Sequence, residues 1–255
     1  MPQDEATAEI QHLLQWSTAN GAFLHENVEI YQDTTTGLSF RAVQAIPPNT
    51  VFASCSNQIT LSYLNAVQAS PIFQTSSPSL PSSFLDALNR EDPNVIGNFF
   101  FMQQYLMGDQ SFWWPYIRSL PQPNDLQRLG IPTVWPEDDQ KFLMNTNAEP
   151  TLKQREKIWR EAWTKGYNLL IPAEFPDAVK YDYNLYKWAA GIFESRSFRP
   201  SLTISLPRQW NEVISEEDQV LIEEHIRRDQ FAMLLPLIDI VSSRIARAPF
   251  ARLGV

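Results

Sequence analysis

The apolar residues of this 255-residue chain change their spacing along the sequence, and this limits the folds open to it. Between residues 28 and 55 they alternate with other residues in short runs, which is typical of half-buried strands. From residue 98 onward they recur at steps of three and four, as on one face of a helix. The segments predicted as short antiparallel strands are 28–30, 38–42 and 51–55, and those predicted as long helices are 98–107, 151–170 and 182–198. The pattern predicts an α+β fold.

Shorter segments complete this prediction. An amphipathic helix is expected over residues 5–19, because Ile10, Leu13, Leu14 and Trp16 have largely helical spacing and Asn20-Gly21 is a fitting stop. A further helix is expected to start within 61–69. A Pro- and Ser-rich stretch at 70–83 indicates a linker or an exposed loop. The last predicted segments are an alternating strand at 201–206, an acidic surface helix within 211–230 and a buried apolar run at 231–241.

Glycine, cysteine and histidine are too few or too scattered for several common kinds of site. The eight glycines are never closer than eleven residues apart, which excludes a GxGxxG dinucleotide turn and a Walker phosphate loop. The single cysteine, Cys55, cannot form an internal disulfide. His12, His25 and His225 are too far apart for a local motif such as HExxH. We therefore expect no dedicated metal site and a reducing compartment.

The charge balance argues against two classes of partner. Twenty Lys and Arg against 29 Asp and Glu give a net charge of −9, which disfavours a general binder of nucleic acid or of anionic membranes. The apolar run at 231–241 is interrupted by Pro236 and Asp239 and falls short of the roughly 20 residues of a membrane helix. The first residues lack the basic start and apolar stretch of an export signal. We expect an intracellular protein, cytoplasmic or nuclear. The sequence does not determine its oligomeric state.

Six segments in a fixed order point to one family. They are Asn20-Gly21-Ala22 after a Trp-containing helix, TTGLSFRA (35–42), LSYLNA (61–66), SFWWPYIRSLP (111–121), WAAGIFESRSF (188–198) and LLPLIDI (234–240). In this order the chain resembles, over about residues 10–240, the SET-domain lysine methyltransferases of the Rubisco large-subunit methyltransferase-like class. The resemblance implies SET-like sheets of short strands interrupted by a mostly helical insertion. It divides the chain into two SET-like parts at 1–74 and 191–241, a helical insertion at 75–190 and an atypical basic tail at 242–255.

The activity implied by the resemblance is protein-lysine N-methyltransfer, with S-adenosylmethionine as cofactor and a protein bearing a target lysine as partner. Such an enzyme must desolvate, deprotonate and aim the lysine amine, because a pKa of about 10.4 leaves roughly one amine in a thousand neutral at physiological pH. The cofactor brings a carboxylate, an adenine and a sulfonium. The protein therefore needs a cation, an apolar slot and main-chain polar groups.

The resemblance also assigns candidate site residues. Arg196 becomes the anchor of the cofactor carboxylate, the main chain at Gly37, Leu38 and Ser39 becomes a cofactor cradle, and Asp239 becomes a further cofactor contact. Phe198 becomes part of the lysine or cofactor pocket. Plainer interpretations stay open: an Arg in a last helical turn interacts with the helix dipole, Gly37 is suited to an ordinary hairpin turn, and Phe198 is suited to the core. The sequence names no catalytic residue.

The chain departs from the family pattern at two places. Ser39 replaces the second glycine of the family's Gly-x-Gly-Leu-x-Ala turn, and Ser242 and Ser243 stand where the family has Asn and His. If that pair supplies about three hydrogen bonds of roughly 1 kcal/mol each, its loss weakens cofactor binding on the order of a hundredfold. No tyrosine follows Tyr186 to serve as the family's catalytic one. We therefore expect a C-terminally truncated SET fold, and a non-catalytic protein-binding remnant or a helical scaffold remain alternatives.

Overall fold

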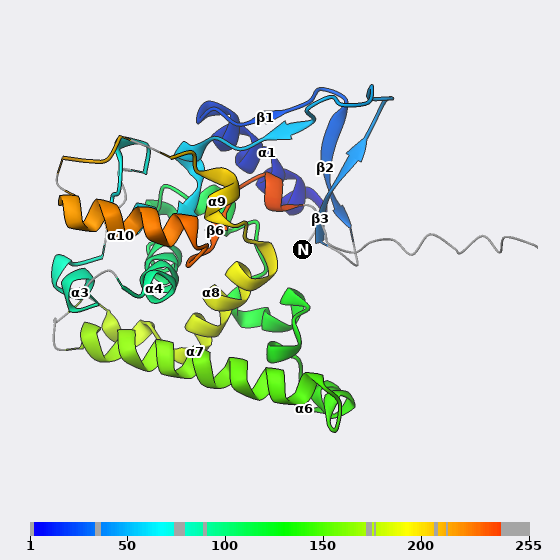
Figure 1. Ribbon diagram of the computed structural model, residues 1–255. Helices are drawn as coiled ribbons and strands as arrows, with labels where there is room; N and C mark the ends of the chain where they lie inside the picture. Colours follow the sequence, from blue (N-terminus) through cyan, green and yellow to red (C-terminus); the bar gives the residue numbers. More distant parts are fainter. Residues whose placement is uncertain are drawn as a thin grey trace, which may run out of the picture.

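The computed structural model describes residues 3–33, 37–73, 80–88, 91–171, 175, 177–206, 209–212 and 214–240. The helices within these ranges are α1 (Gln3–Ala19), α2 (Tyr63–Ala66), α3 (Ser82–Ala87), α4 (Pro93–Leu106), α5 (Trp114–Ile117), α6 (Glu137–Gln140), α7 (Ala148–Leu170), α8 (Tyr183–Arg196), α9 (Pro200–Thr203) and α10 (Glu216–Arg227). The strands are β1 (Phe23–Leu24), β2 (Val28–Asp33), β3 (Gly37–Ala42), β4 (Ala53–Ser54), β5 (Leu61–Ser62) and β6 (Met233–Leu234). Figure 1 shows the β2–β3 hairpin at one end of the molecule and α7 along the opposite side.

The strands pair as three two-stranded antiparallel sheets, which are β1 with β4, β2 with β3, and β5 with β6. The β2–β3 hairpin runs in register from the pair Val28 and Ala42 to the pair Asp33 and Gly37. Gly37 has φ +81°, a left-handed conformation that glycine adopts without strain, and this explains why a glycine opens β3. Small sheets of this kind need helices packed against them, because an isolated pair of strands is marginally stable in water.

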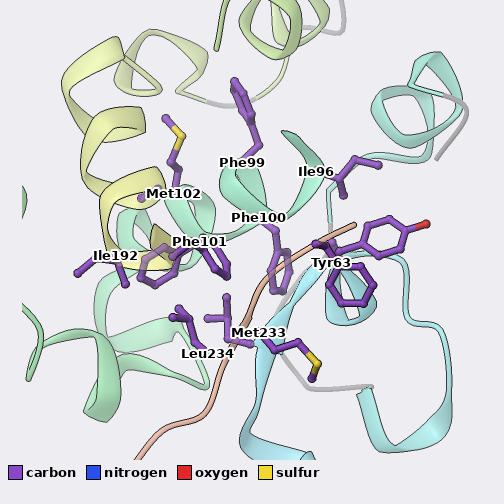
Figure 2. Close-up of a cluster of buried hydrophobic side chains, with 14 of the residues drawn as sticks. Tyr63, Ile96, Phe99, Phe100, Phe101, Met102, Ile192, Met233 and Leu234 are labelled. Atoms are coloured by element: carbon purple, nitrogen blue, oxygen red, sulfur yellow. The ribbon is translucent and has the colours of Figure 1, made fainter. Parts of the chain in front are cut away.

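Helix α4 forms the centre of the core. Proline at its first position is compatible with a helix start, because the N–H that proline lacks would have no partner there. Phe99, Phe100 and Phe101 then point in different directions and are all at most 1% exposed. Figure 2 shows Phe100 and Phe101 on the side of α4 toward Met233 and Leu234 of β6, whereas Phe99 points to the opposite side. The apolar coverage of α4 on several sides therefore reflects burial between the strands and the other helices.

Helices α7 and α8 pack against α4 and against each other. Asp182 caps α8 by accepting a hydrogen bond from the N–H of Leu185 at 2.8 Å. Within α8, Trp188 is fully buried and stacks on Phe101 of α4, with ring centroids 4.5 Å apart. The helix from 182 to 198 predicted from spacing is confirmed, with its end at Arg196.

Strand β6 pairs both with an early segment of the chain and with the residue that follows the end of α8 closely. Leu61 of β5 pairs with Leu234 of β6, and Phe198 forms an isolated bridge with Met233. The N–H of Phe198 donates to the carbonyl oxygen of Met233 at 2.8 Å, and Met233 returns the bond at 3.1 Å. These contacts place the segment after β6 beside the end of α8.

Most of the predicted elements are confirmed, with boundaries shifted by a few residues. The helix expected to start within 61–69 is α2, which begins at Tyr63 because Ser62 caps it. Strand β5 precedes it and pairs with β6. The predicted strand at 51–55 shortens to Ala53–Ser54. The stretch at 70–83 was predicted as a linker or an exposed loop, and its residues 74–79 lie outside the described residues. Phe73 and Leu80, on either side of them, are buried.

One predicted strand is wrong. Residues 201–206 alternate in sequence, yet the structure forms the helical turn α9 instead. Pro200 supplies a first helical position, and the N–H of Ser201 is held by the carboxylate of Asp229 at 3.0 Å. Leu202, which the strand pattern would bury, is 77% exposed. Helix-start chemistry prevailed over alternation here.

The described residues hold no group of three or more His, Cys, Asp or Glu side chains placed to bind a metal ion. None of the described helices is long and apolar enough to cross a bilayer. Val241, Ser242, Ser243 and the basic tail at 242–255 lie outside the described residues. The predicted unit boundaries at residues 74, 190 and 241 stay predictions.

Candidate functional site

Four polar side chains from four parts of the chain gather where α8 ends. Arg196 is the last residue of α8, and its Nη1 donates to the backbone carbonyl oxygen of Asp239 at 3.0 Å. The hydroxyl of Tyr116 on α5 donates to Oδ2 of the same Asp239. Cys55, which follows β4, is close enough for the charge of Asp239 to affect its thiol. We call Arg196, Asp239, Tyr116 and Cys55 the Asp239 cluster.

The local sequence explains how Asp239 reaches this position. After β6 the chain makes a tight turn in which the N–H groups of Ile238 and Asp239 both donate to the carbonyl oxygen of Leu235, at 3.0 and 3.1 Å. The turn continues as a short 3-10 helix, Ile238–Ile240, which packs against β3 of the hairpin. Because the Phe198–Met233 bridge fixes β6 beside the end of α8, this turn meets Arg196.

Burial dominates the electrostatics of the Asp239 cluster. It raises the pKa of the Asp239 carboxyl to about 6, although the Arg196 charge and the Tyr116 hydrogen bond act in the opposite direction. Burial also raises the pKa of the Tyr116 hydroxyl well above its ordinary value, and the Asp239 charge raises it further. Burial together with the Asp239 charge raises the pKa of Cys55 to about 12. At neutral pH Tyr116 is therefore a hydrogen-bond donor, Cys55 is a thiol, and Asp239 is largely ionised.

Two features of the Asp239 cluster suit a ligand that has both an acidic and a basic group. Asp239 is 5% exposed, and its Oδ1 has no hydrogen-bond partner among the described residues. Arg196 is half-buried, and among the described residues no carboxylate forms an ion pair with it. A buried acceptor without a partner is unfavourable, so Asp239 Oδ1 would gain from an ammonium donor. The half-buried Arg196 has further N–H groups suited to a carboxylate.

The sequence-predicted site residues fall into two sets. Arg196 and Asp239 are in direct contact. Gly37, Leu38 and Ser39 lie on β3, all half-buried, and β3 packs on the turn that holds Asp239. A Cβ added to Gly37 would meet no heavy atom within 4 Å, so the main chain is accessible there. Phe198 is half-buried and is fixed by its bridge to Met233. The ligand-binding roles of these residues stay predictions.

Sequence reasoning missed Tyr116 and Cys55. Tyr116 lies within the aromatic segment SFWWPYIRSLP, where its neighbours suggest only core packing, and its partner Asp239 is 123 residues away. The sequence gives Cys55 no disulfide partner and no metal-binding neighbours, and nothing in it indicates that Cys55 lies near Asp239. The signal that was present in the sequence is a tyrosine next to a proline-started helical turn, which fixes the backbone but gives no direction for the hydroxyl.

Two cavities are lined by residues outside the Asp239 cluster. One, of about 320 Å³, lies between α4, α7 and α8 and has Trp159 and Phe193 in its walls. The other, of about 600 Å³, lies between the end of α3 and α10 and is lined mostly by carboxylates. Neither of these two cavities is lined by Arg196 or Asp239.

The chain is similar in sequence to two protein methyltransferases, while no family model matches it. It is 27% identical to the ribosomal lysine N-methyltransferase set10 of Schizosaccharomyces pombe over 76% of this chain and 32% of that protein. It is 23% identical to the actin-histidine N-methyltransferase of Gallus gallus over 72% of this chain and 29% of that protein. The matched region thus spans about a third of the length of these relatives.

The structure is similar to a solved one, that of the SET domain of LSMT bound to lysine and AdoHcy. The TM-score is 0.62 at 16% sequence identity, and the match covers 92% of this chain and 43% of the other. An identity this low supports a statement about the fold and not about the ligands. The chain therefore has a SET-like α+β fold, and its sequence relatives are protein methyltransferases.

Proposed function

We propose that this chain is a protein-lysine N-methyltransferase, or the part of one that binds S-adenosylmethionine. The observation that carries the proposal is the contact of Arg196 with Asp239 beside β3 in a SET-like fold. Two residues predicted as cofactor contacts are thereby neighbours, although 43 residues separate them in sequence. Similarity to methyltransferases named for lysine and histidine targets supports the same chemistry.

The residues present fit the amino-acid end of S-adenosylmethionine. The Arg196 guanidinium would hold the carboxylate, and Asp239 Oδ1 would accept from the ammonium group. Main-chain groups at Gly37 and Ser39 would contact the rest of the cofactor from β3. When bound, S-adenosylmethionine supplies a methyl group on a sulfonium, which is open to attack by a neutral amine. The fold around β3, β6 and α8 would then orient the substrate and exclude water.

The proposed substrate is the lysine side chain of a protein. Phe198, fixed beside β6, would provide an apolar wall along the alkyl part of that lysine. A histidine target is the second candidate, favoured by the similarity to the actin-histidine enzyme. Incubation with radiolabelled S-adenosylmethionine and peptides that differ only in lysine or histidine distinguishes the two, because label on the histidine peptide alone would rule out the lysine proposal.

Calorimetry tests the cofactor part of the proposal. We expect the purified chain to bind S-adenosylhomocysteine at tens of micromolar or more tightly, and Arg196→Ala to weaken binding by about 10- to 100-fold, the equivalent of one charged hydrogen bond or ion contact. Arg196→Lys should bind at an intermediate level, because the charge stays while the planar fork is lost. Arg128→Ala, which removes an exposed arginine paired with Asp125, is the matched control and should leave binding unchanged.

Two results would contradict the proposal. Absence of any heat at hundreds of micromolar ligand would favour the alternative of a non-catalytic protein-binding remnant. Unchanged affinity in Arg196→Ala, with binding retained by the wild type, would remove Arg196 from its proposed role and leave the location of the cofactor site open.

A further inference from the structure

Tyr116 contributes to the Asp239 cluster through a single polar group. Its ring is 1% exposed and packed in the core, and its hydroxyl donates to Asp239 Oδ2. It lies on α5, a turn of helix that packs against α1 and α4, so its position is set by elements that contain neither Arg196 nor Asp239. The hydroxyl is thus a fixed donor to which the Asp239 carboxylate binds.

Asp239 connects this fixed donor to Arg196. Its carboxylate accepts from Tyr116, and its backbone carbonyl oxygen accepts from Arg196 Nη1 at 3.0 Å. A rotation of the peptide unit at residue 239 would break the second bond, while the first bond opposes a shift of the residue as a whole. The orientation of the Arg196 guanidinium therefore depends on where the turn from 235 to 240 is held.

The turn itself needs an external support. Leu237, within it, has φ +78°, a left-handed conformation that is unfavourable for a branched residue. Its side chain is 1% exposed, so the core holds one side of the turn. The Tyr116 hydrogen bond holds the other side at Asp239. Strained backbone of this kind persists only where the surroundings determine it, and such places are frequent at binding sites.

We propose that Tyr116 is a positioning residue of the candidate cofactor site: its hydroxyl holds the 235–240 turn so that Asp239 orients Arg196 and keeps Oδ1 directed to the ligand. This inference rests on the proposed function. Tyr116 itself touches no ligand in it. The hydroxyl, and not the ring, carries the effect, because Phe would fill the same volume.

The proposal has a consequence for protonation. Three titratable groups from three elements face the Asp239 carboxyl: Arg196 from α8, Tyr116 from α5 and Cys55 from the segment after β4. The Tyr116 hydrogen bond lowers the pKa of Asp239 against the effect of burial. Without it the pKa should rise above about 6, and the acceptor should be lost at a higher pH than in the wild type.

The experiment compares Tyr116→Phe with Tyr186→Phe. Tyr186 is an equally buried tyrosine whose hydroxyl accepts from Asn98 Nδ2 at 3.1 Å. Tyr186 and Asn98 both lie outside the Asp239 cluster. For each protein, calorimetry gives the affinity for S-adenosylhomocysteine at pH 7.5, and a carbon-13 titration of the labelled Asp239 carboxyl gives its pKa. The second readout needs no ligand, and Asp239→Asn assigns its signal.

The expected result has three parts. Tyr116→Phe should bind about 10-fold more weakly, the equivalent of one lost hydrogen bond in the site. Its Asp239 titration should move to higher pH than in the wild type. Tyr186→Phe should change neither quantity, which shows that loss of a buried tyrosine hydroxyl is not sufficient.

The failures separate from one another. If the wild type binds and Tyr116→Phe binds equally well, the inference is overturned while the proposed function stands. The inference is also overturned if Tyr116→Phe binds more weakly but leaves the pKa of Asp239 unchanged. The same holds if Tyr186→Phe loses as much affinity, because the effect would then be general destabilisation. If the wild type shows no binding, the proposed function fails first and this inference fails with it.

Discussion

The core around Trp188 and the Asp239 cluster treat buried polar groups in opposite ways. Trp188 is 0% exposed, and its one polar atom, Nε1, donates to the carbonyl oxygen of Pro121 at 2.6 Å. Asp239 is 5% exposed and charged at neutral pH, yet Oδ1 has no partner among the described residues. The first arrangement favours folding, whereas the second is unfavourable in the folded chain alone. Under the function proposed above, the first region stabilises the fold and the second binds a ligand.

The largest expected effect tests the stabilising side of this comparison. Trp188→Ala should lower the free energy of unfolding by about 3–5 kcal/mol, because it leaves a cavity against Phe101 and Tyr105. Trp188→Phe should lose less, since most of the stacking stays while the Nε1 bond to Pro121 goes. Urea unfolding followed by circular dichroism measures both. A loss below about 1 kcal/mol for the alanine variant would show that this core does not stabilise the fold as described.

The next effect has the opposite sign and tests the Asp239 cluster. The pKa of Asp239 is raised from 3.8 to about 6 in the folded chain, so the folded state binds the proton more tightly. The proton on Asp239 therefore stabilises the folded state at low pH. This contribution to the free energy of unfolding, up to about 3 kcal/mol, is lost as the pH rises from about 4 to above 6. Asp239→Asn keeps an acceptor for Tyr116 without the charge, so it should be more stable than the wild type at pH 7.5.

The check on Asp239→Asn is its pH dependence. Urea unfolding at pH 7.5 and at pH 4 should give a clear stabilisation at the higher pH and little difference at the lower one. Cofactor affinity should fall in the same variant, because the charged acceptor is lost. An asparagine variant that is less stable than the wild type at pH 7.5 would mean that the ionised carboxylate is well compensated within the fold.

A smaller effect distinguishes tight packing from loose packing within the helical core. A Cβ on Gly166 of α7 would overlap the ring of Phe99, with Cζ only 2.6 Å away, whereas a Cβ on Gly97 of α4 would meet nothing closer than 3.5 Å. Ala is favoured over Gly in a helix by about 1 kcal/mol, and overpacking costs about 1–3 kcal/mol. Gly166→Ala should therefore destabilise by up to about 2 kcal/mol and Gly97→Ala should stabilise by up to about 1 kcal/mol. Thermal unfolding compares them, and equal shifts would show that Phe99 can move aside.

The sequence predicted the helices well because their period is local. The spacing of apolar residues in α8 depends only on neighbours three and four positions apart, and it predicted the helix to within two residues of its end at Arg196. The prediction of a strand at 201–206 was wrong because the contact that decides its structure is not local. Alternation is a weak signal over six residues, and the cap that Asp229 provides to α9 comes from 28 residues away.

The site was only partly predictable because its geometry is non-local. Arg196 and Asp239 were named through family resemblance, and their contact depends on the pairing of Phe198 with Met233. Nothing in the spacing of residues near Tyr116 indicates that its hydroxyl faces Asp239. The direction of a buried hydroxyl is decided by tertiary packing, which a single sequence does not reveal.

The smallest expected effect concerns the β2–β3 hairpin, which lies beside the Asp239 cluster. Arg41 on β3 pairs with Glu29 directly across on β2 and lies over the ring of Tyr31, 5.0 Å from its centroid. Arg41→Ala should lower the free energy of unfolding by about 0.5–1 kcal/mol, because the exposed ion pair contributes little by itself and the contact with the Tyr31 ring adds to it. Lys157→Ala on α7, whose partner Glu161 is 3.8 Å away and equally exposed, should leave the free energy of unfolding almost unchanged.

Amide hydrogen exchange measures the effect on the hairpin. In Arg41→Ala the exchange of β2 and β3 should be faster while that of α4 stays unchanged, and the difference from the wild type should be smaller at high salt. Equal acceleration in α4 would mean that the hairpin and the helical core open as one unit, which would remove the distinction between a stabilising core and a separately adjustable site.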